Sequence, residues 1–293
     1  MTKLMRKFYD VLPAVAKDHI KFVSRLHYLP NFKQPRTYNE KVNFRKRHYT
    51  SELFALCADK VRVKDYVRDA VGSEVVIDNL FVGDSLEPAH LQELITANDG
   101  AVLKTNNNSG TVFIFDRDAG REDIEHGCSA ARRELGKDYG QIKREPWYSD
   151  ITPKLLVERK LPVKAGEAAL DYKFHVFKQG EGCDPVVILH VDFDRFTNHS
   201  RSYFSEDLEW LPFAVKYPSI YHRIERPENY ERMLEIVKIL AEPFSYVRVD
   251  LYNIRGRIFF GEMTFAHAAG FGAFTSKSYD LWMGNLWKCD PRY

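Results

Sequence analysis

The sequence predicts an α+β fold in which helices and antiparallel sheets follow one another without strict alternation. Several predicted strands succeed each other at hairpin spacing, and the helices between them do not separate the strands one by one. No Gly-x-Gly-x-x-Gly follows the first predicted strand, and no Gly-x-x-x-x-Gly-Lys-Ser/Thr occurs anywhere. A Rossmann dinucleotide-binding unit and a P-loop are therefore excluded.

The chain is long enough for one large or two modest domains, and its charge is unevenly distributed. Its 293 residues have a net charge of +2, but residues 1–68 hold 16 Lys and Arg against six Asp and Glu. The remainder is therefore net negative. No apolar run approaches the ~18 residues of a membrane span, and the basic N-terminus lacks a signal-peptide core, so we expect a cytoplasmic protein. The four cysteines form no Cys-x-x-Cys pair, which argues against a zinc site.

The basic N-terminal part is predicted to be helical. Apolar residues recur at helical spacing from Leu4 to Leu26, and Thr37-x-x-Glu40 is a capping box that opens a second helix through Arg47. Asp59 is expected to cap a third helix over 60–71. The first helix either rests on an anionic membrane surface, binds an acidic polymer, or packs on its own domain with a solvated basic face.

The middle of the chain predicts a small α+β unit followed by more strands. We expect strands at 75–82, 101–104 and 111–115 and helices at 88–97 and 122–135. Further strands are expected at 154–161, 170–178 and 185–193, then a loop-rich segment to 218 and a helix over 227–240.

The last predicted element before the C-terminus is a hairpin over 246–264 that carries two carboxylates, Asp250 and Glu262. A two-residue turn at 255–256 would send Asp250 to the face opposite Glu262. A three-residue loop at 254–256 would place both acids and Arg248 on one face, close enough to share a hard cation. The metal hypothesis therefore predicts the three-residue loop; the alternative is an ordinary hairpin with solvated charges.

A polar loop after the strand at 101–104 is a candidate phosphate site. Lys104 ends the strand, and backbone amides of the following turn could surround phosphates while Lys104 neutralises them. The same pattern fits a solvated hairpin turn. The loop residues proposed for this contact are Asn106, Asn108, Ser109 and Gly110.

Two later strands carry the remaining candidates for a nucleotide. The strand ending in Glu158, Arg159 and Leu161 could offer backbone groups to an adenine, with Glu158 near the ribose or base, although a plain edge strand has the same pattern. Alternation places Asp171 and Lys173 on one face together with His175, which we interpret as structural.

The order and spacing of six segments resemble the TupA-like ATP-grasp family, named for teichuronopeptide biosynthesis. The resemblance covers nearly all of the chain from Thr37 onward. The segments are Ala-Asp-Lys-Val-Arg-Val-Lys-Asp-Tyr-Val at 58–67, Val-Leu-Lys-Thr-Asn-Asn-Asn-Ser-Gly at 102–110, Val-Glu-Arg-Lys-Leu at 157–161, Asp-Tyr-Lys-Phe at 171–174, Val-Asp-Phe-Asp-Arg-Phe at 191–196, and Arg-Val-Asp-Leu-Tyr with Gly-Glu-Met-Thr-Phe at 248–265.

The resemblance implies an ATP-grasp fold in which two α+β subdomains sandwich the nucleotide. The expected ranges are 1–58 for a basic helical segment, 59–160 for the small subdomain and 161–293 for the larger one. Lys104 and Lys173 would contact ATP phosphates, with Asp171 beside them, and the 106–110 turn would close over the phosphates. Residues 158–161 would form the adenine hinge, and Lys60 would open the helix that leads into the small subdomain.

The resemblance also assigns the hairpin a magnesium site. Asp250 and Glu262 would bind magnesium that bridges the phosphates of ATP, and Arg248 would stabilise the acyl-phosphate step. Many ATP-grasp enzymes have Asn two residues after the metal-binding Glu, whereas this chain has Thr264, whose hydroxyl can still bind a hard cation. Too few residues precede Lys60 for the full N-terminal substrate domain of classical ligases, so acceptor recognition is not transferable.

A charged loop after the strand at 185–193 could hold the carboxylate acceptor or the amine. The alternative is a surface ion-pair network. The residues proposed for substrate contact are Asp192, Asp194, Arg195, His199, Arg201 and His267.

These patterns favour an ATP- and Mg²⁺-dependent carboxylate–amine ligase. Its substrates would be an amino acid or amine and a carboxylate-bearing glycan, with peripheral contact to an anionic membrane at the inner face. The alternatives are a sugar kinase and a non-catalytic module that binds acidic glycans. Aromatic residues do not interleave with basic ones as in a stacking platform, so nucleic acid is not expected.

Overall fold

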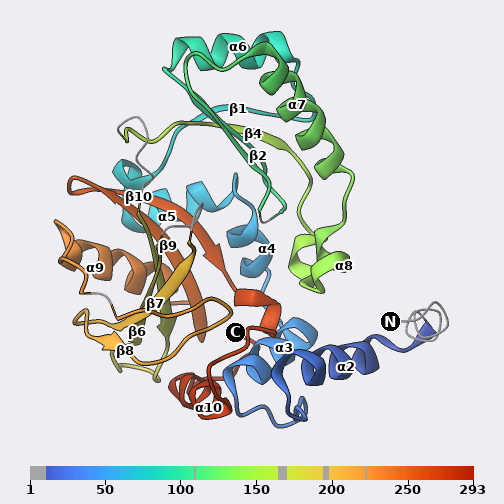
Figure 1. The fold of residues 1–293 in the computed structure, drawn as a ribbon, viewed down its shortest axis with the longest axis vertical. Helices are drawn as coiled ribbons and strands as arrows, with labels where there is room; N and C mark the ends of the chain where they lie inside the picture. The colour runs from blue at the N-terminus through green and yellow to red at the C-terminus, as the bar shows by residue number, and fades with distance from the viewer. Residues whose placement is uncertain (1–10, 109, 164–169, 194–197, 222) are drawn as a thin grey trace.

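The computed structural model describes residues 11–108, 110–163, 170–193, 198–221 and 223–293. The chain forms two separate antiparallel sheets, one of four strands and one of six, stacked along the long axis of the molecule (Figure 1). Helices cover the sheets and fill the region between them. The predicted α+β class is confirmed.

The small sheet has the strand order β1-β4-β2-β3 and carries two helices on one face (Figure 1). Leu91, Leu103, Ile124 and Val157 belong to its core. The strand expected at 75–82 was wrong in its first half, because Ser73–Val75 is a 3₁₀ turn. The elements are β1 Asn79–Gly83, α6 Pro88–Ala97, β2 Ala101–Thr105, β3 Val112–Phe115, α7 Arg121–Leu135 and β4 Leu155–Arg159.

The large sheet has the order β10-β9-β5-β6-β7-β8, and helix α9 (Tyr230–Ala241) packs against β9 and β5. The expected loop-rich segment to 218 was wrong, because it contains β7 and β8. The β7 sequence is mostly polar, so its composition does not predict a strand. The segment forms a strand because it pairs with β6, for example Asp192 with Arg201. The strands are β5 Asp171–Phe177, β6 Val186–Phe193, β7 Ser200–Ser205, β8 Trp210–Leu211, β9 Tyr246–Ile254 and β10 Arg257–Thr264.

The N-terminal helices follow the predicted caps. Helix α3 has both bonds of the capping box, from Glu40 N–H to the Thr37 hydroxyl and from Thr37 N–H to the Glu40 carboxylate. Asp59 accepts from the N–H groups of Val61 at 2.9 Å and Arg62 at 3.4 Å, but the α-helix itself starts only at Val63. The helices in this part and at the C-terminus are α2 Ala14–Leu26, α3 Tyr38–His48, α4 Leu53–Ala58, α5 Val63–Val71, α8 Tyr139–Lys143 and α10 Lys277–Leu286. Helices α4, α8 and α10 were not predicted.

The hydrophobic cores divide the chain differently from the expected ranges. Val63, Val67 and Val71 of α5, which fall within 59–160, pack in the core of the large sheet together with Trp147. Among the described residues, the buried side chains of the small-sheet core lie between Leu86 and Val157, and Leu80 and Phe81 pack against them. The expected boundary at residue 59 therefore does not coincide with a boundary between the two hydrophobic cores. The amphipathic helix α5 follows this position but buries its valines in the core of the large sheet.

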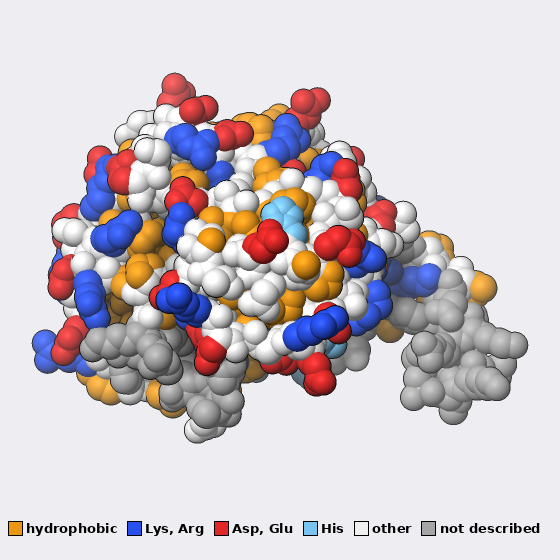
Figure 2. Space-filling model, turned by 90° about the horizontal axis from the view of Figure 1, so that it is seen from above, with side chains coloured by type: hydrophobic (Ala, Val, Ile, Leu, Met, Phe, Trp, Pro, Cys, Tyr) orange, Lys and Arg blue, Asp and Glu red, His pale blue; other side chains and the backbone are white. Residues whose placement is uncertain are grey.

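The outer surface over α6 and α7 carries acidic and basic side chains interspersed (Figure 2). This face has no single-sign patch of the kind that attracts a polyelectrolyte. Within the described residues, no helix has both the length and the apolar character needed to cross a bilayer.

The β9–β10 hairpin places Asp250 and Glu262 on one face, as predicted, but its turn differs from the predicted one. The three-residue loop was wrong: Ile254 pairs with Arg257, so the turn is Arg255-Gly256, with φ of 52° and 80°. Beyond Phe260 the register shifts by one residue, so that Glu262 pairs with Asp250. An extra residue at Gly261 thus returns Glu262 to the face of Asp250.

Replacing Gly261 by Ala is expected to disturb this bulge. The new Cβ would lie 3.1 Å from the backbone oxygen of Asp250 and 3.2 Å from the ring of Tyr252. We expect a loss of about 1–3 kcal/mol in the free energy of unfolding, measured by urea denaturation. Gly120→Ala, whose Cβ would meet only Asp123 at 3.5 Å, is the control. Equal stability of the two variants would show that the bulge is not tightly packed.

Candidate active site

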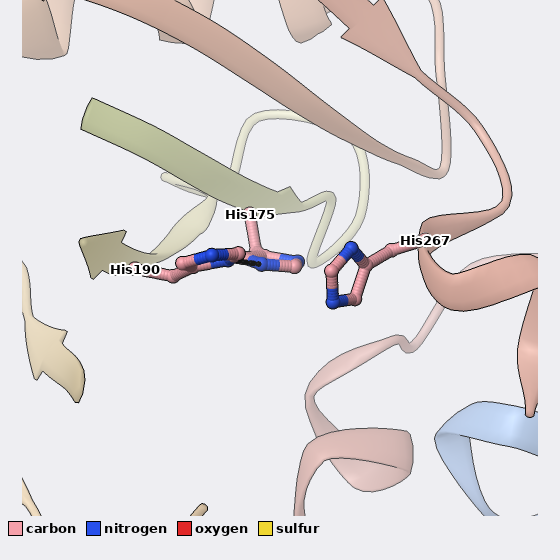
Figure 3. A group of neighbouring side chains, drawn as sticks. All are labelled: His175, His190 and His267. Atoms are coloured by element: carbon pink, nitrogen blue, oxygen red, sulfur yellow. Dashed lines mark hydrogen bonds between the residues drawn. The ribbon is translucent and has the colours of Figure 1, made fainter. Parts of the chain in front are cut away.

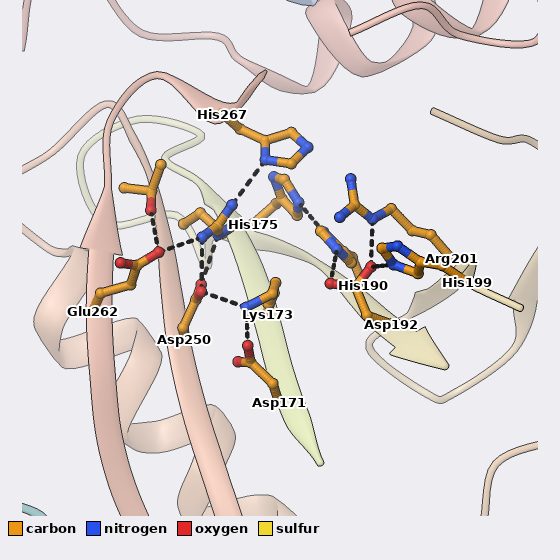
Figure 4. Close-up of polar contacts among 12 residues, drawn as sticks. Asp171, Lys173, His175, His190, Asp192, His199, Arg201, Asp250, Glu262 and His267 are labelled. Atoms are coloured by element: carbon orange, nitrogen blue, oxygen red, sulfur yellow. Dashed lines mark hydrogen bonds and ion pairs between the residues drawn. The ribbon is translucent and has the colours of Figure 1, made fainter. Parts of the chain in front are cut away.

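A row of polar side chains crosses one face of the large sheet. The register pairs Glu262 with Asp250, Asp250 with Lys173, Lys173 with His190, and His190 with Tyr203. Paired residues of neighbouring strands point to the same side of a sheet. Five strands therefore contribute one side chain each to a single line, and the charged end of this line is the candidate site (Figure 4).

Arg248 joins the two carboxylates of this row. Its Nε and Nη2 donate to Asp250 at 2.6 and 2.7 Å, and Nη2 also donates to Glu262 Oε1 at 2.8 Å. Lys173 Nζ donates to Asp250 Oδ2 at 2.7 Å and to Asp171. The structure thus brings together the residues that the sequence assigned to metal, phosphate and charge stabilisation (Figure 4).

The network keeps its central groups ionised although they are buried. Burial alone would raise the pKa of Asp250, but Arg248 and Lys173 lower it below its ordinary value. Burial alone would lower the pKa of Arg248, but Asp250 and Glu262 raise it well above its ordinary value. Both charges are therefore available to a ligand at neutral pH.

The oxygen atoms at this site fit a hard divalent cation. Glu262 remains 35% exposed at its side chain, and its Oε1 accepts a hydrogen bond from Thr264 Oγ1 at 3.2 Å. Arg248 Nη2 contacts both Asp250 Oδ2 and Glu262 Oε1, so a positive charge already lies between the two carboxylates. Carboxylate and hydroxyl oxygens are ligands that Mg²⁺ accepts. The guanidinium of Arg248 shows that these two carboxylates are close enough to bind one cation between them.

A second charged cluster lies on the small sheet, around Glu158. Lys104 Nζ is 2.5 Å from one carboxylate oxygen, and Lys64 Nζ is 2.6 Å from the other. Burial alone would raise the pKa of Glu158, but these two lysines lower it. Both oxygens are engaged by lysines, so a contact from Glu158 to a nucleotide stays a prediction. Lys64 was missed, although its i,i+4 spacing from Lys60 was a usable signal.

Lys60 connects the two charged clusters. Its Nζ donates to the backbone oxygen of Asn108, and its charge interacts with both Glu262 and Glu158. Burial lowers the pKa of Lys60. The residue that the sequence placed at the start of a helix therefore lies between the large-sheet and small-sheet sites.

The loop after β2 is buried and is held in place by hydrogen bonds. Asn106 donates to Asp59 and to the backbone oxygen of Thr152, both at 3.0 Å, and accepts from Lys154 N–H at 2.7 Å. Residues 105–108 are buried, so the alternative of a solvated hairpin turn is wrong up to Asn108. Ser109 lies outside the described residues. Gly110 has a φ of 113° and open space where a Cβ would be.

The expected adenine hinge lies at the end of β4. Arg159 pairs with Ala101 of β2, and its backbone N–H donates to the carbonyl oxygen of Asp78, just before β1. Its exposed side chain is 3.4 Å from the Asp78 carboxylate. Leu161 follows the strand, and its carbonyl accepts from Val163 N–H. Their contact with a nucleotide stays a prediction.

The charged segment expected to bind substrate is partly an internal ion cluster. Asp192 Oδ1 lies 2.7 Å from Arg201 Nε and 2.9 Å from His199 Nε2 (Figure 4). Burial alone would raise the pKa of Asp192, but its contacts with His190 and Arg201 lower it. Asp194 and Arg195 lie outside the described residues. Asp192 and Arg201 therefore have a structural partner each, and their contact with substrate stays a prediction.

The arrangement of segments that carries these clusters matches a known family. The model of the TupA-like ATPgrasp family matches residues 40–288. The chain belongs to this family. The resemblance predicted from the sequence is thereby confirmed, and α2 lies before the matched region.

Similarity to solved structures is distant, and no curated protein matches the sequence. D-alanine–D-alanine ligase from Bacillus anthracis is 14% identical with a TM-score of 0.42, over 71% of this chain and 57% of that one. The same enzyme from Helicobacter pylori is 14% identical with a TM-score of 0.42, over 86% and 68%. N5-carboxyaminoimidazole ribonucleotide synthetase from Thermus thermophilus is 13% identical with a TM-score of 0.42, over 78% and 52%. The TupA-like chain thus spans little more than half the length of several of these structures.

Three buried histidines stand behind Arg248 in this TupA-like ATPgrasp chain (Figure 3). His175 Nε2 is 3.2 Å from His190 Nδ1, and Arg248 Nη1 donates to His267 Nδ1 at 2.8 Å. Burial lowers the pKa of all three and brings that of His190 to about 3, so they are neutral. A metal ion here would displace these hydrogen bonds and face the Arg248 charge. His267 therefore helps to position Arg248. His175 bonds to Tyr246 and His190, which agrees with its structural interpretation.

A cavity of about 560 Å³ opens beside the site. Arg248, Glu262 and Thr264 line it, together with Glu145 from the turn-rich segment after α8. Burial raises the pKa of Glu145 to about 7. Nothing in the sequence singles out Glu145, because no periodic element or motif contains it. The charged face of the sheet is thus connected to a space large enough for a small-molecule ligand.

Neutral histidines in the core predict a loss of stability in acid. Their folded-state pKa is lowered, so the unfolded chain binds protons first as the pH falls below about 6.5. Each such histidine removes about 1.4 kcal/mol of unfolding free energy per pH unit below that value until its folded pKa is reached. His190→Gln should therefore flatten the dependence between pH 6.5 and 4.5 by about this amount, measured by urea denaturation. Exposed His48→Gln is the control, and an unchanged slope in His190→Gln would contradict the assignment.

Proposed function

We propose that this chain is an ATP-dependent carboxylate–amine ligase that releases ADP. The observation that carries the proposal is the alternation of charge across the large sheet, from Glu262 through Arg248 and Asp250 to Lys173. Transfer of a phosphoryl group needs positioning and charge neutralisation more than covalent participation of the protein. Family membership supports the same class of reaction.

The proposed reaction has two steps. An oxygen of the substrate carboxylate attacks the γ-phosphorus of ATP, and ADP leaves, so that an acyl phosphate forms. The amine nitrogen then attacks the acyl carbon, phosphate leaves, and the nitrogen loses a proton to give an amide. Water must be excluded between the steps, because an acyl phosphate hydrolyses.

The residues divide these tasks between the two sheets. Lys173 and Arg248 on the large sheet stabilise charge on the transferred phosphoryl group and on the acyl phosphate. Lys104 reaches the phosphates from the small sheet, and Lys60 reaches them from its position between the two sheets. Gly110 lies in the loop after β2, where it leaves open space. The adenine lies along residues 158–161.

Asp250 and Glu262, with Thr264 beside them, would hold magnesium. The bound ion would neutralise the phosphate oxygens of ATP. Arg248 would contact the substrate phosphoryl group, and its hydrogen bond to His267 would hold its guanidinium near the site.

The substrates follow from the family resemblance. We infer that an amino acid or amine is attached to a uronic-acid-containing cell-surface polysaccharide or its precursor. A lipid-linked precursor would bring the enzyme to an anionic membrane surface at the inner face.

A phosphate-release screen tests the reaction class. The enzyme is mixed with ATP, Mg²⁺, glucuronate-containing oligosaccharides and a panel of amino acids and amines. A ligase releases phosphate and forms an amide only when both the acid and the amine are present. Phosphorylated sugar without phosphate release would establish the kinase instead, and no turnover across a broad panel would favour a binding module.

Glu262→Gln is the most informative single variant, because the partly exposed carboxylate can change without unfolding the core. It should lower kcat by roughly 10²- to 10³-fold, the usual effect of removing one electrostatic contact at a reacting phosphoryl or oxyanion group. Exposed Glu209→Gln makes the same chemical change away from the site and should keep full activity. Activity of Glu262→Gln within threefold of the parent enzyme would remove Glu262 from the site.

A further inference from the structure

The wall of the cavity beside Glu262 carries an excess of positive charge. Within the described part of the chain, none of four lysine and arginine side chains on this wall forms an ion pair. Glu145 and Glu262 are the acidic residues that line the same cavity. The four cations are Lys21, Arg25, Lys143 and Lys216.

Helix α2 is fixed to the protein in the orientation that directs its cations to the cavity. Asp18, which is buried, is 2.6 Å from Arg47 of α3 and also pairs with Arg144, next to α8. Phe22 is fully buried against Phe32 and Phe271. The anchored residues lie one turn or less from Lys21 and Arg25, so the helix cannot turn its basic face away without losing these contacts.

The cavity wall combines elements from distant parts of the chain. Lys21 and Arg25 come from α2, Lys143 from the end of α8, and Lys216 from the segment after β8. The Lys21 ammonium lies 4.2 Å from the centre of the Phe271 ring, which holds the side chain over the cavity edge. The outer face over α6 and α7 differs from this cavity wall, because acidic and basic side chains are interspersed there (Figure 2).

We propose that this cavity is the acceptor subsite, and that α2, which precedes the region matched by the family, supplies the selectivity for a polyanionic uronate oligosaccharide. The assignment rests on the proposed ligase function. One carboxylate of the acceptor reaches Arg248 and Glu262, where it is activated. Lys21, Arg25, Lys143 and Lys216 bind the acid groups of neighbouring sugar units.

The number of cations decides between a single acid and an oligomer of acids. A lone carboxylate is satisfied by one or two cationic donors, as Asp250 is by Arg248 and Lys173. Four further cations without an ion-pair partner in the described residues, next to the charged face of the sheet, can therefore bind further acid groups on the same substrate. A neutral glycan or a small monocarboxylic acid would leave most of them without a partner.

Calorimetric titration of the full-length protein with tetraglucuronate, in 150 mM salt, tests the subsite. The double variant Lys21→Ala/Arg25→Ala should weaken binding by about 10- to 100-fold, since it removes two charged donors. Lys33→Ala/Arg36→Ala makes the same charge change at exposed positions of the neighbouring segment and should leave the affinity unchanged. Lys143→Ala, from the α8 part of the wall, should weaken binding on its own, by about tenfold.

Two further measurements separate a folding defect and a wrong reaction class from a wrong subsite. Thermal stabilisation by a non-hydrolysable ATP analogue should be the same in the double variant and the parent. Tetraglucuronate binding that depends on Lys21 and Arg25 upholds the subsite even if amine-dependent turnover is never found, whereas turnover with an unchanged acceptor KM in the double variant overturns it. Binding of maltotetraose as tight as that of tetraglucuronate, or a preference for tetraglutamate, also overturns the assignment.

Discussion

The guanidinium of Arg248 lies between two carboxylates that the chain brings together only through a register shift. A regular hairpin with the observed two-residue turn would direct Asp250 and Glu262 to opposite faces of the sheet. The extra residue at Gly261 corrects this, and the pairing of β9 with β5 then adds Lys173 to the same line. The position of Glu262 beside Arg248 and Asp250 follows from this bulge. Burial, together with the positive charge of Arg248, lowers the pKa of the histidines behind it and keeps them neutral.

Such a network is a poor way to stabilise a fold. Buried ion pairs lose hydration that their mutual attraction only partly replaces, and hydrophobic replacements of similar volume are often as stable. This chain nevertheless places Arg248 and Asp250 almost completely inside, at 7% and 2% exposure, next to an open cavity. An arrangement that contributes little to stability and faces a substrate-sized space is typical of a site organised for a ligand. The second cluster, Glu158 with Lys64 and Lys104, is likewise a buried ion-pair network, formed between α5 and the small sheet.

Much of the fold could be predicted from the sequence, because periodicity and caps are local. The capping box of α3, the helix at 88–97 and the strands that carry Lys173 and Asp250 follow from such signals. The bulge could not be predicted, since Gly261 is needed through its contact with the backbone of Asp250 on another strand. Strand β7 was missed because its partner, not its composition, makes it a strand. Glu145, Lys64 and the cations of α2 reach the sites only through tertiary packing, and the local sequence around Glu145 carries no trace of it.

The proposed ligase function requires this face of the large sheet to activate a carboxylate by phosphorylation. The most direct measurement follows an oxygen atom: a glucuronate acceptor labelled with ¹⁸O in its carboxylate is turned over with ATP, Mg²⁺ and the amine, and the released phosphate is analysed by mass spectrometry. We expect one ¹⁸O in each phosphate, because the carboxylate oxygen attacks phosphorus and leaves with it when the amide forms. Unlabelled phosphate alongside amide product, or label retained in full by the glycan, would contradict the claim.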